Sequence, residues 1–262
     1  MLNSVFATKI GMTQAWTTAG KRMAVTRCKV EAMSVVGKQP SQDPQSQILE
    51  IGYGQKKLKN MSKPLRSKLE KGGFSFGVKE IKGLRVEATA DQEVPAIGST
   101  LKPFEILTVG DVVKVQGVTK GMGFAGAMKR HGFHGGSRTH GQSDRARAVG
   151  SIGAGTTPGR VLKGKRMPGH MGTETQTVAG LVILYVNPET QEVWLSGPVP
   201  GFATSTMTIR KTGETKSVEL DLKASGIKQP VVEETPVVAE TPVVEETSVE
   251  PVVTEVTEEV TA

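Results

Sequence analysis

The amino-terminal part of the chain alternates apolar and polar positions with a period of two. This period is typical of strands that bury one face. The pattern covers VFATKIGM (5–12) and MAVTRCKV (23–30), and the TTAG sequence between them predicts a turn. QILEIGYG (47–54) predicts a further strand after the polar stretch SQDPQSQ. The chain therefore opens with β-structure.

A helix is predicted next, in the basic stretch SKPLRSKLEKGG (62–73). Pro64 lies near its start and Gly72 just past its end, which are the favoured places for these residues. VKEIKGLRVEA (78–88) returns to a strand-like pattern, and ILTVGDVVKVQGV (106–118) suggests a hairpin.

Strand patterns resume near the carboxyl end. TVAGLVILYVNPETQEVWLSG (177–197) predicts two strands joined by a short turn at 187–190, and TSTMTIRKTG (204–213) predicts one more. Many short strands separated by turn signals favour a barrel or a sandwich, and their apolar content is enough for one core. We therefore predict a mainly β protein.

Residues 119–172, here called the extension, break this pattern. Glycines are so dense in this segment that few helices or strands of normal length fit between them. The segment therefore cannot bury enough apolar surface to offset the entropy lost on ordering. We interpret it as a long functional excursion from a β-barrel, leaving near Val118 and returning near Thr173.

The extension is strongly basic. Asp144 is its one acidic residue, and all four histidines of the chain lie within it. Its Lys, Arg and His residues are the candidate binding residues, namely Lys120, Lys129, Arg130, His131, His134, Arg138, His140, Arg145, Arg147, Arg160, Lys163, Lys165, Arg166 and His170. A concentration of positive charge in one glycine-rich segment indicates a polyanionic partner.

Charge along the whole chain supports this interpretation. The net charge is +7 and the pI is about 9.4, although residues 230–262 hold nine Glu and no Lys or Arg. A solvated basic surface would explain net charge alone, but not its concentration in the extension. The Glu-, Thr-, Pro- and Val-rich end, 229–262, is predicted to be a disordered acidic tail.

Other features exclude whole classes of protein. A single cysteine, Cys28, rules out an internal disulfide framework and fits a reducing compartment. The amino terminus lacks the apolar run of a secretory signal. The longest apolar run, 179–186, is far shorter than the roughly 20 residues that span a bilayer. We expect a soluble, cytoplasmic protein without a membrane partner.

Four patterns in the extension suggest other chemistry. Gly121–Gly126 matches GxGxxG, but neither a βαβ unit nor a strand-ending acid follows it. Gly159–Lys165 resembles a P-loop, yet Arg166 stands where the Mg²⁺-binding Ser or Thr belongs. The histidines have irregular spacing, and no cysteine accompanies them as in common zinc sites. His140, Ser143 and Asp144 are too close in sequence to presume a catalytic triad. We predict no cofactor, no metal, no small-molecule substrate and no enzymatic activity.

Folded RNA fits the extension better. Glycines allow close backbone approach, Arg binds phosphates through two parallel hydrogen bonds, and Lys neutralises them as a point charge. The scarcity of aromatic residues argues against a single-strand binder and favours recognition of shape and phosphate.

Several long motifs occur in an order that resembles the bacterial large-subunit ribosomal protein L3 family. They are KIGMTQAW (9–16), TKGMGFAGAMKRHGF (119–133), RTHGQSDRARAVGSIGAGTTPGRVLKGKRMPGHMG (138–172) and SGPVPG (196–201). The similarity runs from about Val5 to about Lys211.

The resemblance implies a translation-protein-type β-barrel formed by 1–118 and 173–228, with a small α+β side domain at about 56–105. It implies that the extension, 119–172, binds large-subunit ribosomal RNA directly and reaches toward the peptidyl-transferase centre. It also implies a non-catalytic protein that acts early in subunit assembly beside neighbouring large-subunit ribosomal proteins.

Within the extension, the resemblance assigns roles to two adjacent stretches. Residues 150–159, with Gly153, Gly155 and Thr157, would lie nearest the catalytic RNA, and 160–166 would clamp nearby backbone. Some family members carry a methylated Gln where this chain has Thr156, so that modification cannot occur here. The acidic tail lies outside the family pattern.

Two rival functions remain open at the level of sequence. A non-ribosomal RNA chaperone or assembly factor would also be basic and glycine-rich. An enzyme would use the P-loop-like or histidine-rich residues.

Overall fold

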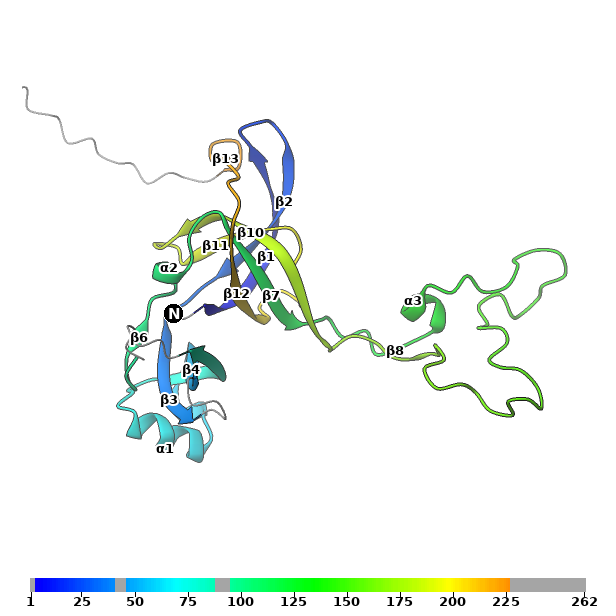
Figure 1. The fold of residues 1–262 in the computed structure, drawn as a ribbon, viewed down its shortest axis with the longest axis horizontal. Coiled ribbons are helices and arrows are strands. Elements are labelled where there is room, and N and C mark those ends of the chain that lie inside the picture. Colours follow the sequence, from blue (N-terminus) through cyan, green and yellow to red (C-terminus); the bar gives the residue numbers. More distant parts are fainter. Residues whose placement is uncertain (1–2, 41–45, 88–94, 227–262) are drawn as a thin grey trace, which may run out of the picture. The chain divides into compact units, whose positions relative to one another are not determined.

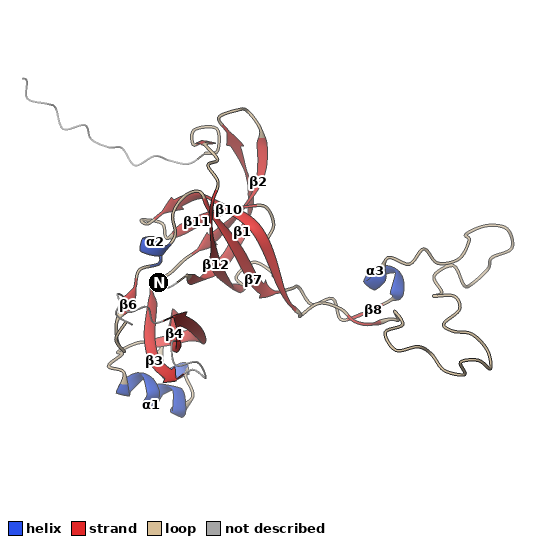
Figure 2. Ribbon diagram, viewed as in Figure 1, coloured by secondary structure: helices blue, strands red, loops and turns tan. Residues whose placement is uncertain are grey.

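The computed structural model describes residues 3–40, 46–87 and 95–226. The expected acidic tail, 229–262, lies outside these residues. Figures 1 and 2 show a mainly β protein in which helices are few and short. None of the helices in the described part of the chain is long and apolar enough to cross a membrane.

The larger sheet closes into a barrel of six antiparallel strands in the order β12-β7-β10-β11-β2-β1, and β1 then pairs with β12. The strands are β1 (Ser4–Thr17), β2 (Arg22–Lys29), β7 (Asp111–Val118), β10 (Thr175–Asn187), β11 (Glu192–Ser196) and β12 (Thr206–Thr215). The long strand β1 pairs with both β12 and β2. Its first half pairs with β12 and its second half with β2, with an irregularity between Lys9 and Gly11. The short strand β13 (Leu220–Asp221) pairs with the far end of β1.

A second sheet has the order β5-β4-β3-β6. Its strands are β3 (Met33–Pro40), β4 (Ser46–Lys56), β5 (Gly77–Glu87) and β6 (Thr100–Leu101). The connection from β4 to β5 holds a 3-10 turn, η1 (Leu58–Asn60), and helix α1 (Lys63–Lys71), while α2 (Pro103–Ile106) follows β6. The expected side domain at about 56–105 starts too late, because this sheet already begins at Met33.

One hydrophobic cluster takes side chains from both sheets. Phe6 of β1 stacks on Tyr53 of β4, with ring centroids 5.1 Å apart. Buried side chains such as Ile51 from the second sheet and Ile183 and Ile209 from the barrel belong to the same cluster. The apolar alternation that predicted the strands therefore points into a shared core.

Two details differ from the sequence-based prediction. The hairpin expected at 106–118 is wrong, because the chain turns at Gly110, whose φ is +92°, and then forms the single strand β7. Strand β3 was not predicted. Its first residues, Met33 to Val36, are all buried, so the stretch lacks the polar alternation that marks a half-exposed strand.

The extension lies outside the core. Among the described residues, none of the members of the three hydrophobic clusters falls between 119 and 172. The two ends of the extension are close together, because Val118 of β7 pairs directly with Thr175 of β10.

Replacing 119–172 with a short Gly/Ser turn is therefore expected to leave a cooperatively unfolding protein. Closing a loop costs roughly 0.6 kcal/mol per doubling of its length, so the shorter connection is expected to raise the free energy of unfolding by about 2 kcal/mol. Urea unfolding followed by circular dichroism measures this change. A deletion protein without a cooperative transition would mean that the extension contributes to the core.

An ion pair to a buried carboxylate lies at the start of β7. Lys211 Nζ lies 2.8 Å from Oδ2 of Asp111, and the backbone N–H and hydroxyl of Thr108 donate to the same oxygen at 2.9 and 2.7 Å. Burial alone would raise the pKa of Asp111, but the hydrogen bonds from Lys211 and Thr108 outweigh it and hold this pKa below its ordinary value.

Asp111→Asn is expected to lower the free energy of unfolding at pH 7 by about 2 kcal/mol, the scale of hydrogen bonds to a charged group. Because the folded-state pKa is lowered, this stabilisation is complete above the unfolded pKa of about 3.9 and is lost as the pH falls through the folded value. Urea unfolding between pH 7 and pH 3 measures the penalty. The control is Glu105→Gln, whose exposed pair with Lys102 is expected to contribute almost nothing. A penalty for Asp111→Asn that stays constant over this range would contradict the expectation.

Candidate nucleic-acid interface

The root of the extension is a backbone ladder that continues β7 and β10 beyond the barrel (Figure 1). The N–H of Thr119 donates to the carbonyl of Glu174 at 2.9 Å, and that of Met122 to the carbonyl of Met171 at 2.9 Å. The short strands β8 (Phe124–Ala125) and β9 (Gly169–His170) extend this pairing. The two sides of the root are therefore held by backbone pairing, which needs no apolar side chains.

Close packing of the two strands explains one glycine of the root. Gly172 has a φ of +83°, and a Cβ at this position would collide with the carbonyl oxygen of Lys120. A side chain here would push the two strands apart. The glycine content of this part of the chain is thus partly a requirement of the root itself.

Helix α3 (Ala127–His131) follows β8 and ties the outgoing chain to the returning one. Arg130 Nη1 donates to the carbonyl of Met167 at 2.8 Å, and His131 Nε2 lies 3.0 Å from the same oxygen. Because a carbonyl only accepts, His131 Nε2 carries the hydrogen. The helix ends at Gly132, which adopts the left-handed conformation with φ +73°. Arg130 and His131 are thus held in place before any partner binds.

Beyond α3 the chain forms turns with few internal hydrogen bonds. The N–H of Gly136 donates to the carbonyl of Ala146 at 2.9 Å, and Ser151 Oγ donates to the carbonyl of Gly153 at 2.9 Å. Every residue from 150 to 166 is exposed. This far part includes the uncharged stretch 150–159 and the basic stretch 160–166.

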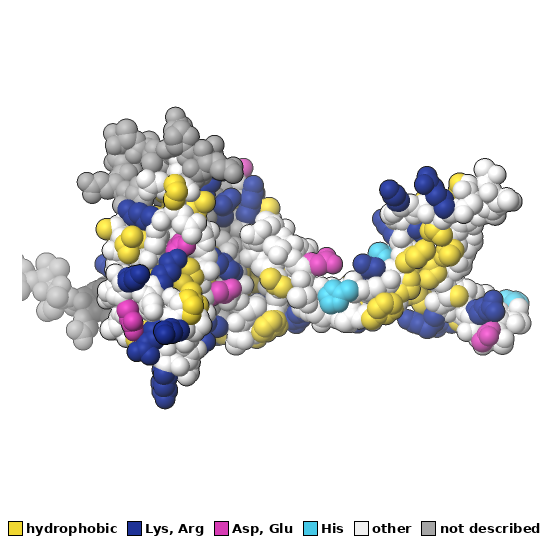
Figure 3. Space-filling model, turned by 90° about the horizontal axis from the view of Figure 1, so that it is seen from below, with side chains coloured by type: hydrophobic (Ala, Val, Ile, Leu, Met, Phe, Trp, Pro, Cys, Tyr) yellow, Lys and Arg dark blue, Asp and Glu magenta, His cyan; other side chains and the backbone are white. Residues whose placement is uncertain are grey.

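The structure brings the predicted binding residues to the surface of one segment. Arg130 and His131 are half-buried. The exposed candidates are Lys120, Lys129, His134, Arg138, His140, Arg145, Arg147, Gly153, Gly155, Thr157, Arg160, Lys163, Lys165, Arg166 and His170. Figure 3 shows Lys and Arg side chains along the extension, with hydrophobic side chains between them.

The extension differs from the barrel in how its charges are satisfied. Among the described residues, no Lys or Arg of the extension takes part in an ion pair, and Arg130 is the only one whose side chain forms a hydrogen bond. In the barrel, by contrast, some cations are paired, as Arg27 is with Glu192 at 2.7 Å. The extension therefore presents a set of cations without an internal counter-charge.

The alternative motifs do not acquire the structures that their chemistry needs. Gly121–Gly126 lies in the root and leads into a five-residue helix, and every strand pairing in the described part of the chain is antiparallel. Gly159–Lys165 lies in a turn region with neither strand nor helix. Within the described ranges, no group of three or more His, Cys, Asp or Glu residues could hold a metal ion.

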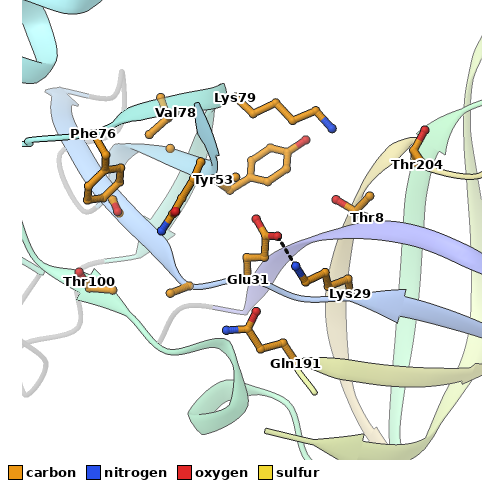
Figure 4. A pocket seen from close by; sticks show the side chains of 15 residues that line it. Thr8, Lys29, Glu31, Tyr53, Phe76, Val78, Lys79, Thr100, Gln191 and Thr204 are labelled. Carbon is orange, nitrogen blue, oxygen red and sulfur yellow. Dashed lines mark hydrogen bonds and ion pairs between the residues drawn. The ribbon is translucent and has the colours of Figure 1, made fainter. Parts of the chain in front are cut away.

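A cleft of about 690 Å³ lies between the barrel and the second sheet (Figure 4). Three of its polar side chains have partners within the protein. Lys29 Nζ pairs with Glu31 at 2.8 Å, and the hydroxyl of Tyr53 donates to Glu80. Burial and the contact with Glu80 raise the pKa of Tyr53, so this phenol stays protonated. We therefore place the candidate interface on the extension and not in this cleft.

Sequence reasoning missed two features at the root. Phe124 is 81% exposed, the largest exposed fraction among the described large hydrophobic side chains. Lys9 is buried in the barrel wall, where its Nζ donates to the carbonyls of Val199 and Gly201 at 2.9 and 3.0 Å. The SGPVPG motif (196–201) contributes to the family resemblance, but nothing in its residues indicates that a buried lysine holds this loop.

Comparison with known proteins follows the same residues. Residues 85–196 match the family model described as ribosomal protein L3. The chain is 36% identical over 201 residues to the large ribosomal subunit protein uL3 of Herpetosiphon aurantiacus, covering 77% of this chain and 92% of that protein.

Two further relatives with the same name give a similar picture. The protein of Dehalococcoides mccartyi is 36% identical over 214 residues, covering 82% of this chain and 100% of that protein. The protein of Roseiflexus sp. is 39% identical over 211 residues, covering 80% and 98%. With this identity over nearly the full length of these relatives, the chain belongs to the ribosomal protein L3 family.

Proposed function

We propose that this protein is a structural constituent of the large ribosomal subunit that binds large-subunit ribosomal RNA through the extension, residues 119–172. The observation that carries this proposal is the set of exposed cations without internal counter-charges on a segment that contributes nothing to the hydrophobic clusters. Membership of a family of structural ribosomal proteins supports it and argues against an enzymatic role.

RNA supplies what the extension lacks. Phosphates along a folded RNA would neutralise the Lys and Arg side chains and release condensed counterions, which provides most of the binding free energy of such contacts. The glycines would let the backbone lie close to the RNA surface. The barrel and the second sheet would remain folded through their own core, with other large-subunit proteins as neighbours.

We further propose that the extension enters the RNA early in assembly and directs 150–159 toward the peptidyl-transferase centre. The uncharged stretch has small side chains, whereas Arg147 precedes it and Arg160, Lys163 and Lys165 follow it. This arrangement suits a tip seated where RNA leaves little space, with phosphate contacts on both sides.

An RNA chaperone that leaves the particle is the alternative to a stable ribosomal constituent. Co-sedimentation separates the two, because a constituent stays stoichiometric on mature large subunits after a moderate salt wash. Loss of the protein from washed mature subunits would favour the chaperone.

Binding to large-subunit RNA is expected to depend strongly on salt. Neutralisation of 6 to 10 phosphates would lower the affinity by roughly 10³ to 10⁵ between 50 and 200 mM salt, a scale taken from double-stranded DNA. Filter binding with the intact protein measures the slope, and Lys163→Ala is expected to reduce it by about 1. An affinity that barely changes over this range would mean that neutral contacts dominate.

Substitutions at the tip and in its basic flank are expected to have opposite effects. Gly155→Arg adds bulk and charge to the tip, so it is expected to slow peptide-bond formation or change drug response there, with near-normal incorporation. Arg160→Ala and Lys165→Ala remove phosphate contacts and are expected to weaken incorporation into subunits instead. Quantitative mass spectrometry measures occupancy, and peptide-bond formation is measured per occupied subunit.

Gly155→Ala serves as the control for the tip, since no atom lies within 4 Å of a Cβ at this position. It is expected to behave like the wild type in both assays. Normal peptide-bond formation and drug response in fully occupied Gly155→Arg subunits would show that the tip does not lie near the catalytic centre.

A further inference from the structure

The root of the extension carries two rings on one face of its β-ribbon. Phe124 of β8 and His170 of β9 are direct partners in the antiparallel pairing, so their side chains project from the same face. Phe124 is 81% exposed and His170 is also exposed. The core gains almost nothing from a phenylalanine in this position. The pair forms a small ring platform, defined here as Phe124 and His170.

The Phe124 side chain is uncovered by its neighbours along the chain. A Cβ at Gly123 or at Gly126 would meet no atom within 4 Å. The two glycines that flank β8, Gly123 and Gly126, therefore carry no side chain that could cover the Phe124 ring. This openness distinguishes Phe124 from an aromatic residue that folds back on its own protein.

A cationic cleft lies beside the platform and shares His170 with it. The cleft has a volume of about 520 Å³, and its lining includes Lys120, Arg130, His131 and His170. Glu174 is the one carboxylate in the lining. An anionic group is therefore favoured in the cleft over a cationic one.

Arg130 is fixed at this cleft. Its Nη1 donates to the carbonyl of Met167, and a Cβ on Gly169 would lie 2.7 Å from the same nitrogen. The glycine thus leaves room for the guanidinium against β9. The other guanidinium donors of Arg130 have no partner among the described residues, so they remain available to bind a phosphate in a preset orientation.

We propose that the root binds one unstacked nucleotide of the ribosomal RNA, with its base on the Phe124–His170 platform and its phosphate at Arg130 and Lys120. This inference rests on the proposed function and adds a specific contact to it. A base needs a flat apolar face and a phosphate needs a fixed cation, and the root offers both within one short ribbon. A hydrophobic contact with a neighbouring protein would not explain the cations beside the platform.

The experiment compares full-length variants bound to large-subunit RNA. Phe124→Ala and Phe124→Leu remove the ring, Phe124→Tyr keeps it, and Phe202→Ala is the matched control because Phe202 is also exposed but lies in the barrel loop. Affinity is measured against salt concentration, and base-specific chemical probing reports the reactivity of each nucleotide.

Removal of the ring is expected to weaken binding by about 5- to 150-fold, the range measured for stacking of one base on an aromatic side chain. Phe124→Ala and Phe124→Leu are expected to expose the same single base to the probe without changing the salt slope. Arg130→Ala is expected to lower the slope by about 1. Phe124→Tyr and Phe202→Ala are expected to match the wild type.

Two results would contradict the proposed binding of a base by the ring platform. The first is equal affinity and equal base reactivity for Phe124→Ala and the wild type, while Arg160→Ala still weakens binding. The second is a cross-link to protein, and not to RNA, from a photoreactive phenylalanine analogue at position 124 in intact subunits. Failure of the wild type itself to bind large-subunit RNA would instead reject the proposed function.

Discussion

The backbone ladder between β7 and β10 is the interaction on which the rest of the arrangement depends. Within the barrel it joins strands whose side chains fill the core, and beyond Val118 and Thr175 it continues without a core. Backbone pairing satisfies the polar groups of both strands without apolar side chains. A glycine-rich segment can therefore begin from a fixed root, although its composition could not support a domain of its own.

Charge follows the same division. In the barrel, Asp111 is buried and its charge is met by Lys211 and by the donors of Thr108. In the extension, cations stand in solvent, where leaving them unpaired costs little until a partner removes their water. The folded body thus pairs some of its charges internally, as at Asp111, whereas the extension keeps its cations available.

Much of this architecture could be predicted from the sequence, because half-exposed strands leave an alternating trace. That trace located β1, β2, β4 and β5, and Pro64 with Gly72 delimited α1. Strand β3 left no such trace, since its first five residues are all buried and do not alternate between apolar and exposed polar positions. The hairpin at 106–118 was wrongly predicted for a related reason. In the sequence, a glycine between two apolar stretches looks the same whether a hairpin or a single strand follows.

The candidate site shows where composition stops being informative. The number of Lys and Arg residues identified the extension, because their concentration in one segment is visible in the sequence whatever the backbone conformation. The number of aromatic residues did not identify Phe124, because the proposed role of this ring depends on its partner strand and its exposure. Both arise only when β8 pairs with β9. Mobile cations attract any RNA, whereas a held guanidinium such as that of Arg130 favours one geometry. If the extension binds RNA as proposed, selectivity for one RNA site would depend on the few root residues that the fold itself immobilises.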